Sequence, residues 1–221
     1  MTPQKLIFHE RPLYGHDKTC SIDLILFDFG GVLAEEGFRN GLIAIARLNG
    51  LDPDAFLENV YDITFTRGYV LGNADEKTFW QALREHTGIK GSDEELRNEI
   101  LSRFTLRGWM LEIIKRLHQD SLLLAILSDQ TNWLDELDAQ HGFFKLFDRV
   151  FNSYHLGKCK RDASLFEDVL GEMGVRPERA LFIDDTKENI ERAHLKGLHT
   201  IHYQGREPFM ESLVSFCPFL Q

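Results

Sequence analysis

The sequence lacks a long apolar run, an excess of positive charge and a regular cysteine pattern. No stretch approaches the roughly 18 consecutive apolar residues of a membrane span, so we expect no membrane insertion. The N-terminal stretch MTPQKLIFHERPLYGHD contains acids and no long apolar core, which argues against a secretory signal peptide. The formal net charge of −10 argues against a nucleic-acid partner, because a phosphate backbone requires a cationic surface.

The three cysteines, Cys20, Cys159 and Cys217, show no metal-ligand spacing and cannot all pair within one chain. We interpret them as reduced thiols and therefore expect a cytoplasmic protein. Hydrophobic residues make up 43% of the chain and charged residues 27%, which is close to globular averages and predicts a sizeable core. A length of 221 residues allows one domain, or a larger domain that carries a smaller inserted one.

Short apolar runs at 22–27, 122–127 and 180–183 each stop at polar residues. Such non-alternating runs are typical of strands that are buried on both faces of a parallel sheet. Residues 150–151 and 199–203 are weaker strand candidates. Helical patterns at 109–118, 162–173 and 186–196 separate the strands. This alternation predicts a Rossmann-like, doubly wound α/β core.

The strand signal disappears between residues 34 and 106, where helical patterns at 38–48, 54–66, 75–86 and 93–104 replace it. This stretch is too long for an ordinary loop and predicts a small inserted helical cap. We divide the chain into an N-terminal extension (1–20), an α/β core (21–33 and 107–221) and the cap (34–106). Several large cap residues are expected to pack inside the cap rather than face a cleft: Phe38, Arg39, Phe65, Tyr69 and Trp80.

Reactive side chains follow the predicted strands at their carboxyl ends, where open parallel sheets bind ligands. Asp28 follows the first strand, Ser128 the second, and Asp184 and Asp185 a later one. Carboxylates brought together repel one another unless a cation neutralises them, and hard oxygen ligands suit Mg²⁺. Each residue alone is more simply a turn or helix-cap residue, but their joint order predicts a phosphoryl-transfer site.

These motifs resemble those of the haloacid dehalogenase-like hydrolase superfamily, specifically its members with a helical cap after the first strand. LILFDFGGVL, LLLAILSDQTN, the GKCKR loop and ALFIDDTKENIERAHLKGL are similar to the four family motifs in order. The resemblance implies a magnesium-dependent phosphatase in which Asp28 is the nucleophile and Lys160, rather than Lys158, the assisting cation. It further implies two binding sets, namely Ser128, Asp129, Gly31 and Lys160 for phosphate, and Asp28, the Gly30 carbonyl, Asp185 and nearby Asp184 for the metal.

Two positions depart from the family pattern. Arg161 stands where proline is usual, and Gly30 stands where the phosphatases carry an aspartate that acts as general acid and base. Two alternatives to a phosphatase of a small phosphorylated metabolite therefore remain open. One is a catalytically weak or silent binding protein. The other is a carbon–halogen or phosphonate hydrolase, which for phosphonates needs a cap lysine, and the cap contains only Lys77 and Lys90. The oligomeric state is not predicted.

Overall fold

The fold is described from a computed structural model that covers residues 20–66, 68–118 and 122–221. A five-stranded, fully parallel sheet in the order β3-β2-β1-β4-β5 forms its centre. The strands are β1 (Leu24–Phe27), β2 (Leu123–Ser128), β3 (Arg149–Asn152), β4 (Ala180–Asp184) and β5 (His199–His202). All five were expected from the sequence, and the Rossmann-like fold class with an inserted helical cap is confirmed.

The register of the sheet explains why the strand ends matter. Phe27, the last residue of β1, pairs with Ile126 of β2 on one side and Ile183 of β4 on the other. The residues that follow these three positions therefore emerge side by side at one edge of the sheet. The backbone N–H of Asp28 donates to the carbonyl of Ile183 at 2.9 Å, which extends the pairing into the first polar residue.

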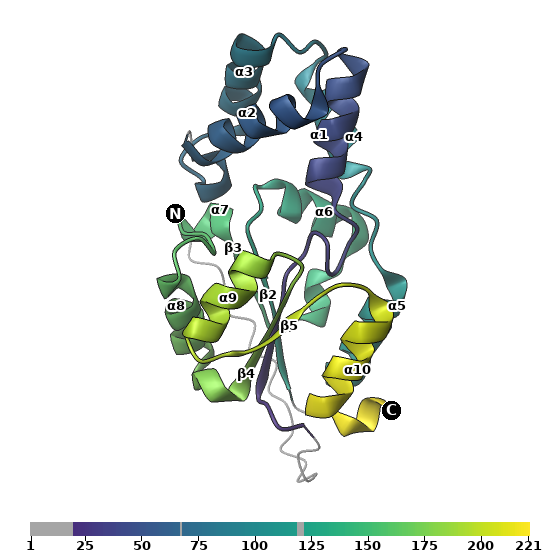
Figure 1. The fold of residues 1–221 in the computed structure, drawn as a ribbon, viewed down its shortest axis with the longest axis vertical. Helices are drawn as coiled ribbons and strands as arrows, with labels where there is room; N and C mark the ends of the chain where they lie inside the picture. The colour runs from purple at the N-terminus through teal and green to yellow at the C-terminus, as the bar shows by residue number, and fades with distance from the viewer. Residues whose placement is uncertain (1–19, 67, 119–121) are drawn as a thin grey trace.

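Helices cover both faces of the sheet, because alternate residues of β1 point to opposite sides. Ile25 and Phe27 pack in a cluster with α5 (Gly108–His118), α6 (Trp133–His141) and α10 (Arg206–Phe216). Leu24 and Leu26 pack in a second cluster with α8 (Ser164–Met173) and α9 (Lys187–Leu195). Figure 1 shows these groups on opposite sides of the strands. The sequence did not reveal α6, α10 or the short α7 (Ser153–Leu156).

Four further helices lie together beyond the carboxyl edge of the sheet (Figure 1). They are α1 (Gly37–Leu48), α2 (Pro53–Thr66), α3 (Glu76–Thr87) and α4 (Asp93–Leu101), close to the predicted spans. Tyr69 and Trp80 are fully buried and pack against Trp133 of α6, with ring centroids 5.7 and 5.8 Å apart. The expected packing role of these two aromatic residues is thus confirmed, and they join the cap to the core.

The two chain segments that connect core and cap are bound to each other. The N–H of Glu35 donates to the carbonyl of Thr105 at 2.9 Å, and the N–H of Arg107 donates to the carbonyl of Leu33 at 2.9 Å. The Arg107 guanidinium also donates to the carbonyls of Gly31 and Val32 and pairs with the Glu35 carboxylate at 3.0 Å. One arginine on the returning segment therefore fixes the outgoing loop.

The interpretation of three reduced thiols is wrong for two of them. Cys20 and Cys217 form a disulfide across a sequence separation of 197 residues, while Cys159 is free and buried. Distant cysteines can pair because the fold, not their spacing, brings them together. Disulfides persist chiefly in oxidising compartments, so the cytoplasmic location loses one of its supports and stays a prediction.

The expectations about membrane insertion and the N-terminal extension are tested only in part. None of the described helices is long and apolar enough to cross a membrane. The predicted N-terminal extension lies outside the described residues, apart from Cys20.

Breaking the disulfide is expected to lower the free energy of unfolding by about 2–5 kcal/mol, since it removes a constraint on the unfolded chain. Urea unfolding of the wild-type protein and of Cys217→Ser, each with and without dithiothreitol, checks this. Reductant should lower wild-type stability toward that of the variant and leave the variant unchanged. Equal wild-type stability in both buffers contradicts the prediction.

Candidate active site

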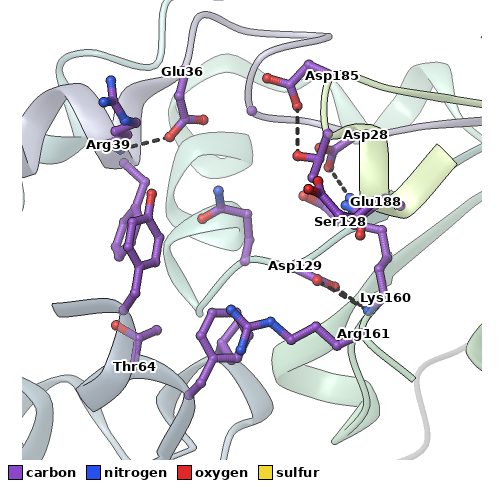
Figure 2. Close-up of a pocket in the computed structure, with 18 of the residues that line it drawn as sticks. Asp28, Glu36, Arg39, Thr64, Ser128, Asp129, Lys160, Arg161, Asp185 and Glu188 are labelled. Carbon is purple, nitrogen blue, oxygen red and sulfur yellow. Dashed lines mark hydrogen bonds and ion pairs between the residues drawn. The ribbon is translucent and has the colours of Figure 1, made fainter. Parts of the chain in front are cut away.

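A cavity of about 450 Å³ lies between the carboxyl edge of the sheet and the helical cap. Figure 2 shows its walls, to which both the strand-end loops and the cap helices contribute. Its volume is in the range of small-molecule sites. The predicted site residues that line it are Asp28, Gly30, Ser128, Asp129, Lys160 and Asp185.

Asp28 is 8% exposed at the end of β1. Its Oδ1 accepts the N–H of Phe29 at 2.7 Å and lies 2.9 Å from the Lys160 ammonium. Among the described residues, no hydrogen bond is made to its Oδ2. Burial raises the pKa of Asp28 well above its ordinary value, Lys160 opposes this, and the charges of Asp184 and Asp185 add to the rise. The Asp28 carboxylate is thus held through Oδ1, while Oδ2 is left without a hydrogen bond from the described residues.

Lys160 is 1% exposed, and its ammonium lies between two carboxylates. Nζ is 2.6 Å from Asp184 Oδ2 and 2.9 Å from Asp28 Oδ1. Burial alone lowers the pKa of Lys160, but the charges of Asp184, Asp28 and Asp129 outweigh burial and raise the pKa above its ordinary value. Lys160 is therefore a permanent positive charge within the site. Lys158, by contrast, does not line the cavity, and its Nζ lies 2.5 Å from Asp168 Oδ2.

Asp184 and Asp185 follow one another at the end of β4 but have different surroundings. Asp184 is fully buried, and its carboxylate accepts the N–H of Thr186 at 2.7 Å and the amide of Asn189 at 3.2 Å. Asp185 is less buried, and burial followed by the Asp184 charge raises its pKa. Carboxylate oxygens of Asp28, Asp184 and Asp185 all lie within 4.8 Å of one another, close enough for the three side chains to share one cation.

Gly31 is required where it stands. Its φ is +81°, a conformation that glycine adopts readily. A Cβ at this position would lie 2.0 Å from Asp185 Oδ2, so any side chain collides with the carboxylate cluster. The sequence placed Gly31 in the phosphate site, and the structure places it against Asp185.

Ser128 is the last residue of β2 and Asp129 follows it, at the same edge of the sheet as Asp28. Ser128 is 2% exposed and lines the cavity. Both carboxylate oxygens of Asp129 accept the backbone N–H of Lys160, at 2.9 and 3.2 Å. Burial raises the pKa of Asp129, and Lys160 opposes the rise. The Asp129 side chain thus holds the loop that carries Lys160, and its contact with a phosphate stays a prediction.

Several cavity residues were not singled out from the sequence. Glu36 of the first connecting segment lines the cavity, and so does Arg161 of the loop after α7, which the sequence marked only as standing where proline is usual. Three cap residues that were expected to pack within the cap also line the cavity, namely Phe38, Arg39 and Phe65. The Arg161 guanidinium lies 3.4 Å from the Phe65 ring centroid, so the residue that replaces proline joins the core loop to cap helix α2.

Glu36 has two differently placed oxygens. It is the N-cap of α1, and its Oε1 accepts the N–H of Arg39 at 2.8 Å. Its Oε2 accepts no hydrogen bond from the described residues. Burial raises the pKa of Glu36, and the Arg39 N–H opposes the rise. No sequence pattern distinguishes Glu36 from its neighbour Glu35; only the path of the chain does so.

Comparison with known proteins agrees with this geometry. The model of the haloacid dehalogenase-like hydrolase family matches residues 22–194. D-ribitol-5-phosphate phosphatase of Bacteroides thetaiotaomicron is 23% identical over 201 residues, which cover 86% of this chain and 95% of that protein. The acyl-CoA dehydrogenase family member 10 of Mus musculus is 28% identical over 50% of this chain, which spans only 10% of that protein.

Solved structures share the fold. A haloacid dehalogenase family enzyme of Bacteroides thetaiotaomicron superposes with a TM-score of 0.72 at 21% identity, covering 87% of this chain and 98% of that one. The complex of that enzyme with magnesium and inorganic phosphate gives a TM-score of 0.64 at 21% identity, covering 85% and 96%. At this level of identity, the two superpositions establish the fold.

Replacing Lys160 by methionine is expected to lower the free energy of unfolding by about 3–5 kcal/mol in metal-free buffer, because Asp28 and Asp184 lose their shared counter-charge. Urea unfolding in the presence of EDTA measures the change. Lys158→Met is the matched control, and it should change stability little because its partner is at the surface. Equal effects of the two substitutions contradict the prediction.

Replacing Gly31 by alanine should destabilise the protein more than the same change at Gly50. Both glycines have positive φ, +81° and +68°, but a Cβ at Gly50 meets nothing within 4 Å. Gly50→Ala measures the backbone strain alone, about 1–2 kcal/mol. Gly31→Ala adds the collision with Asp185, which we expect to cost about 1–3 kcal/mol more. Equal decreases in the free energy of unfolding of the two variants, measured in urea, would show that Asp185 moves aside freely.

Proposed function

Since the chain belongs to the haloacid dehalogenase-like hydrolase family, we propose that it is a magnesium-dependent phosphatase that cleaves a small phosphorylated metabolite through Asp28. The observation that carries this proposal is the placement of the Asp28 carboxylate, anchored through Oδ1 beside a buried lysine and inside a three-carboxylate cluster. A phosphate ester requires a nucleophile, a counter-charge and a metal site within one small volume. These residues fulfil all three requirements.

The donor set fits magnesium. Asp28, Asp184 and Asp185 offer hard carboxylate oxygens within 4.8 Å of one another, and one ammonium group offsets only part of their charge. Mg²⁺ prefers such oxygens and keeps sites open for water and phosphate. Asp28 and Asp185 would hold it together with the Gly30 carbonyl, with Asp184 beside them. When bound, it neutralises charge on the phosphoryl group.

The attacking atom is Asp28 Oδ2. Its partner Oδ1 is held by the Phe29 N–H and the Lys160 ammonium, which fixes the plane of the carboxylate. Oδ2 attacks phosphorus and forms an aspartyl-phosphate while the ester bond to the leaving oxygen breaks. Water then attacks phosphorus and releases the phosphate, and the bonding electron pair returns to the Asp28 carboxylate.

Two residues stabilise the phosphoryl group in transit. The Ser128 hydroxyl, buried at the end of β2, donates a hydrogen bond to a phosphoryl oxygen. Lys160 supplies positive charge that is fixed in place by Asp184 before substrate arrives, so no reorganisation is needed during the reaction. Asp129 contributes by holding the Lys160 backbone.

The cavity walls indicate the kind of substrate. Its lining away from Asp28 mixes hydrogen-bonding groups with three aromatic rings, and includes Phe38, Arg39, Tyr61, Thr64, Phe65 and Gln130. Such walls suit a small hydroxylated molecule rather than an apolar one. We therefore place polyol and sugar phosphates, the class that includes the substrate named for the Bacteroides thetaiotaomicron phosphatase, first in a substrate screen.

The phosphonate alternative loses support. That chemistry needs a lysine beside the bound carbonyl, and both predicted candidates, Lys77 and Lys90, are exposed and absent from the cavity lining. A silent binding protein remains the competing hypothesis. Its one support is Gly30. Turnover that depends on Asp28 would distinguish a phosphatase from a silent binding protein.

Hydrolysis of 4-nitrophenyl phosphate should require Mg²⁺ and Asp28. We expect EDTA to abolish turnover and added Mg²⁺ to restore it, because the carboxylate cluster otherwise repels the phosphate. Asp28→Asn removes the nucleophile but keeps its shape, and should lower kcat by at least about 10³-fold. Release of nitrophenolate at 405 nm measures both effects.

The control is Lys158→Met, whose lysine lies outside the cavity and whose kcat should match that of the wild-type protein. Absence of wild-type turnover, or turnover that survives in Asp28→Asn, overturns the phosphatase proposal. Binding of inorganic phosphate without any turnover would favour the silent protein.

A further inference from the structure

Ester cleavage at Asp28 leaves one chemical requirement unmet. The departing alkoxide needs a proton, and the water that later attacks phosphorus must lose one. Asp28 is the nucleophile, and the Lys160 ammonium is held by two carboxylates. Gly30, the second residue after the nucleophile, has no side chain to transfer a proton. A titratable side chain that lines the cavity would meet this requirement.

The space beside Gly30 contains a carboxylate. A Cβ built on Gly30 would lie 2.8 Å from Glu36 Oε2, closer than from any other atom. The next nearest atoms belong to the Phe104 ring, at 3.5 Å, and the Gln130 amide, at 3.6 Å, and neither of these groups transfers protons. A glutamate from six residues downstream therefore reaches the volume that a side chain at position 30 would fill.

The chain path brings Glu36 into this position. Gly30 forms an isolated bridge with Ala34, which turns the loop back on itself just before α1. Glu36 then caps α1 through Oε1, which leaves Oε2 turned away from the helix. Figure 2 shows Glu36 and Asp28 on the same opening, contributed by different segments. The Cα atoms of residues 28 and 30 are at most about 7 Å apart, so Glu36 and Asp28 line the same part of the cavity.

The other acidic side chains that line the cavity either have other partners or lie away from Gly30. Both oxygens of Asp129 accept the Lys160 N–H. Asp185 belongs to the carboxylate cluster with Asp28. Glu188 lies in α9 and is exposed. Of the acids that line the cavity, Glu36 alone lies beside Gly30 and keeps one oxygen free of hydrogen bonds from the described residues.

We propose that Glu36 is the general acid and base of this enzyme, acting through Oε2 from the position that Gly30 leaves open. The proposal rests on the phosphatase function and deepens it. As Asp28 Oδ2 bonds to phosphorus, the bond from phosphorus to the leaving oxygen breaks, and that oxygen takes the electron pair and the Glu36 proton. Water then attacks phosphorus and gives a proton to the Glu36 carboxylate, while the bond to Asp28 breaks.

Rapid mixing of Glu36→Gln with 4-nitrophenyl phosphate and Mg²⁺ tests the assignment. Glutamine keeps an oxygen for the Arg39 N–H, so the helix cap is retained while proton transfer is lost. Nitrophenolate leaves without a proton, so the variant should release one equivalent per active site in a fast burst. Its steady-state rate should then fall by about 10²–10⁴-fold, because water attack lacks its base.

Two further variants separate proton transfer from structure. Gly30→Asp combined with Glu36→Gln places a carboxylate at position 30, and should recover the steady-state rate to within about tenfold of wild type. Gly30 has no positive φ, and the group nearest its Cβ is the end of a flexible side chain, so the substitution is sterically possible. Glu188→Gln makes the same chemical change at another glutamate of the cavity, and should leave the ratio of burst to steady-state rate at its wild-type value.

The outcomes distinguish this inference from the proposed function. Absence of wild-type turnover overturns the phosphatase proposal itself. An active wild-type enzyme whose Glu36→Gln variant turns over at the wild-type rate overturns only the role of Glu36. Loss of the burst along with the steady state, with no recovery from the aspartate at position 30, shows that Glu36 acts through structure and also overturns its role.

Discussion

The ammonium of Lys160 is the constraint on which this site depends. Asp28 and Asp184 are both buried, and the Lys160 ammonium lies 2.9 Å from one carboxylate and 2.6 Å from the other, so it offsets part of their mutual repulsion. Asp129 holds the loop that carries Lys160. The sheet register brings the aspartates together, and the lysine makes their proximity tolerable. Negative charge still predominates, which leaves the cluster ready for a divalent cation.

The cap and the segments that lead to it contribute side chains to the cavity. The segment that leads into the cap places Glu36 beside Gly30, and the Arg161 guanidinium stacks on the Phe65 ring, which joins the core loop to cap helix α2. Arg107 binds the outgoing loop from the returning segment. The geometry of the loop after β1 therefore depends on residues from both ends of the insertion.

The sequence predicted the sheet and the strand-end residues because both follow from local patterns. An apolar run that stops at Asp28 or at Asp184 identifies a strand and its reactive end together. The positions of Glu36 and Arg107 depend on how the chain turns after β1, which no local pattern records. Helices α6 and α10 were missed because each buries only two or three apolar residues, too few for a clear helical period. The pairing of Cys20 with Cys217 depends on contacts between residues 197 positions apart.

That disulfide makes most of the polypeptide a covalent ring. Between Cys20 and Cys217 lie every strand of the sheet, the whole cap and all of the site residues. A protease that cuts once within this ring opens it but releases no fragment, since the two pieces stay joined through sulfur. Both halves of the site, Asp28 near one end and Asp184 near the other, remain parts of one molecule after such a cut.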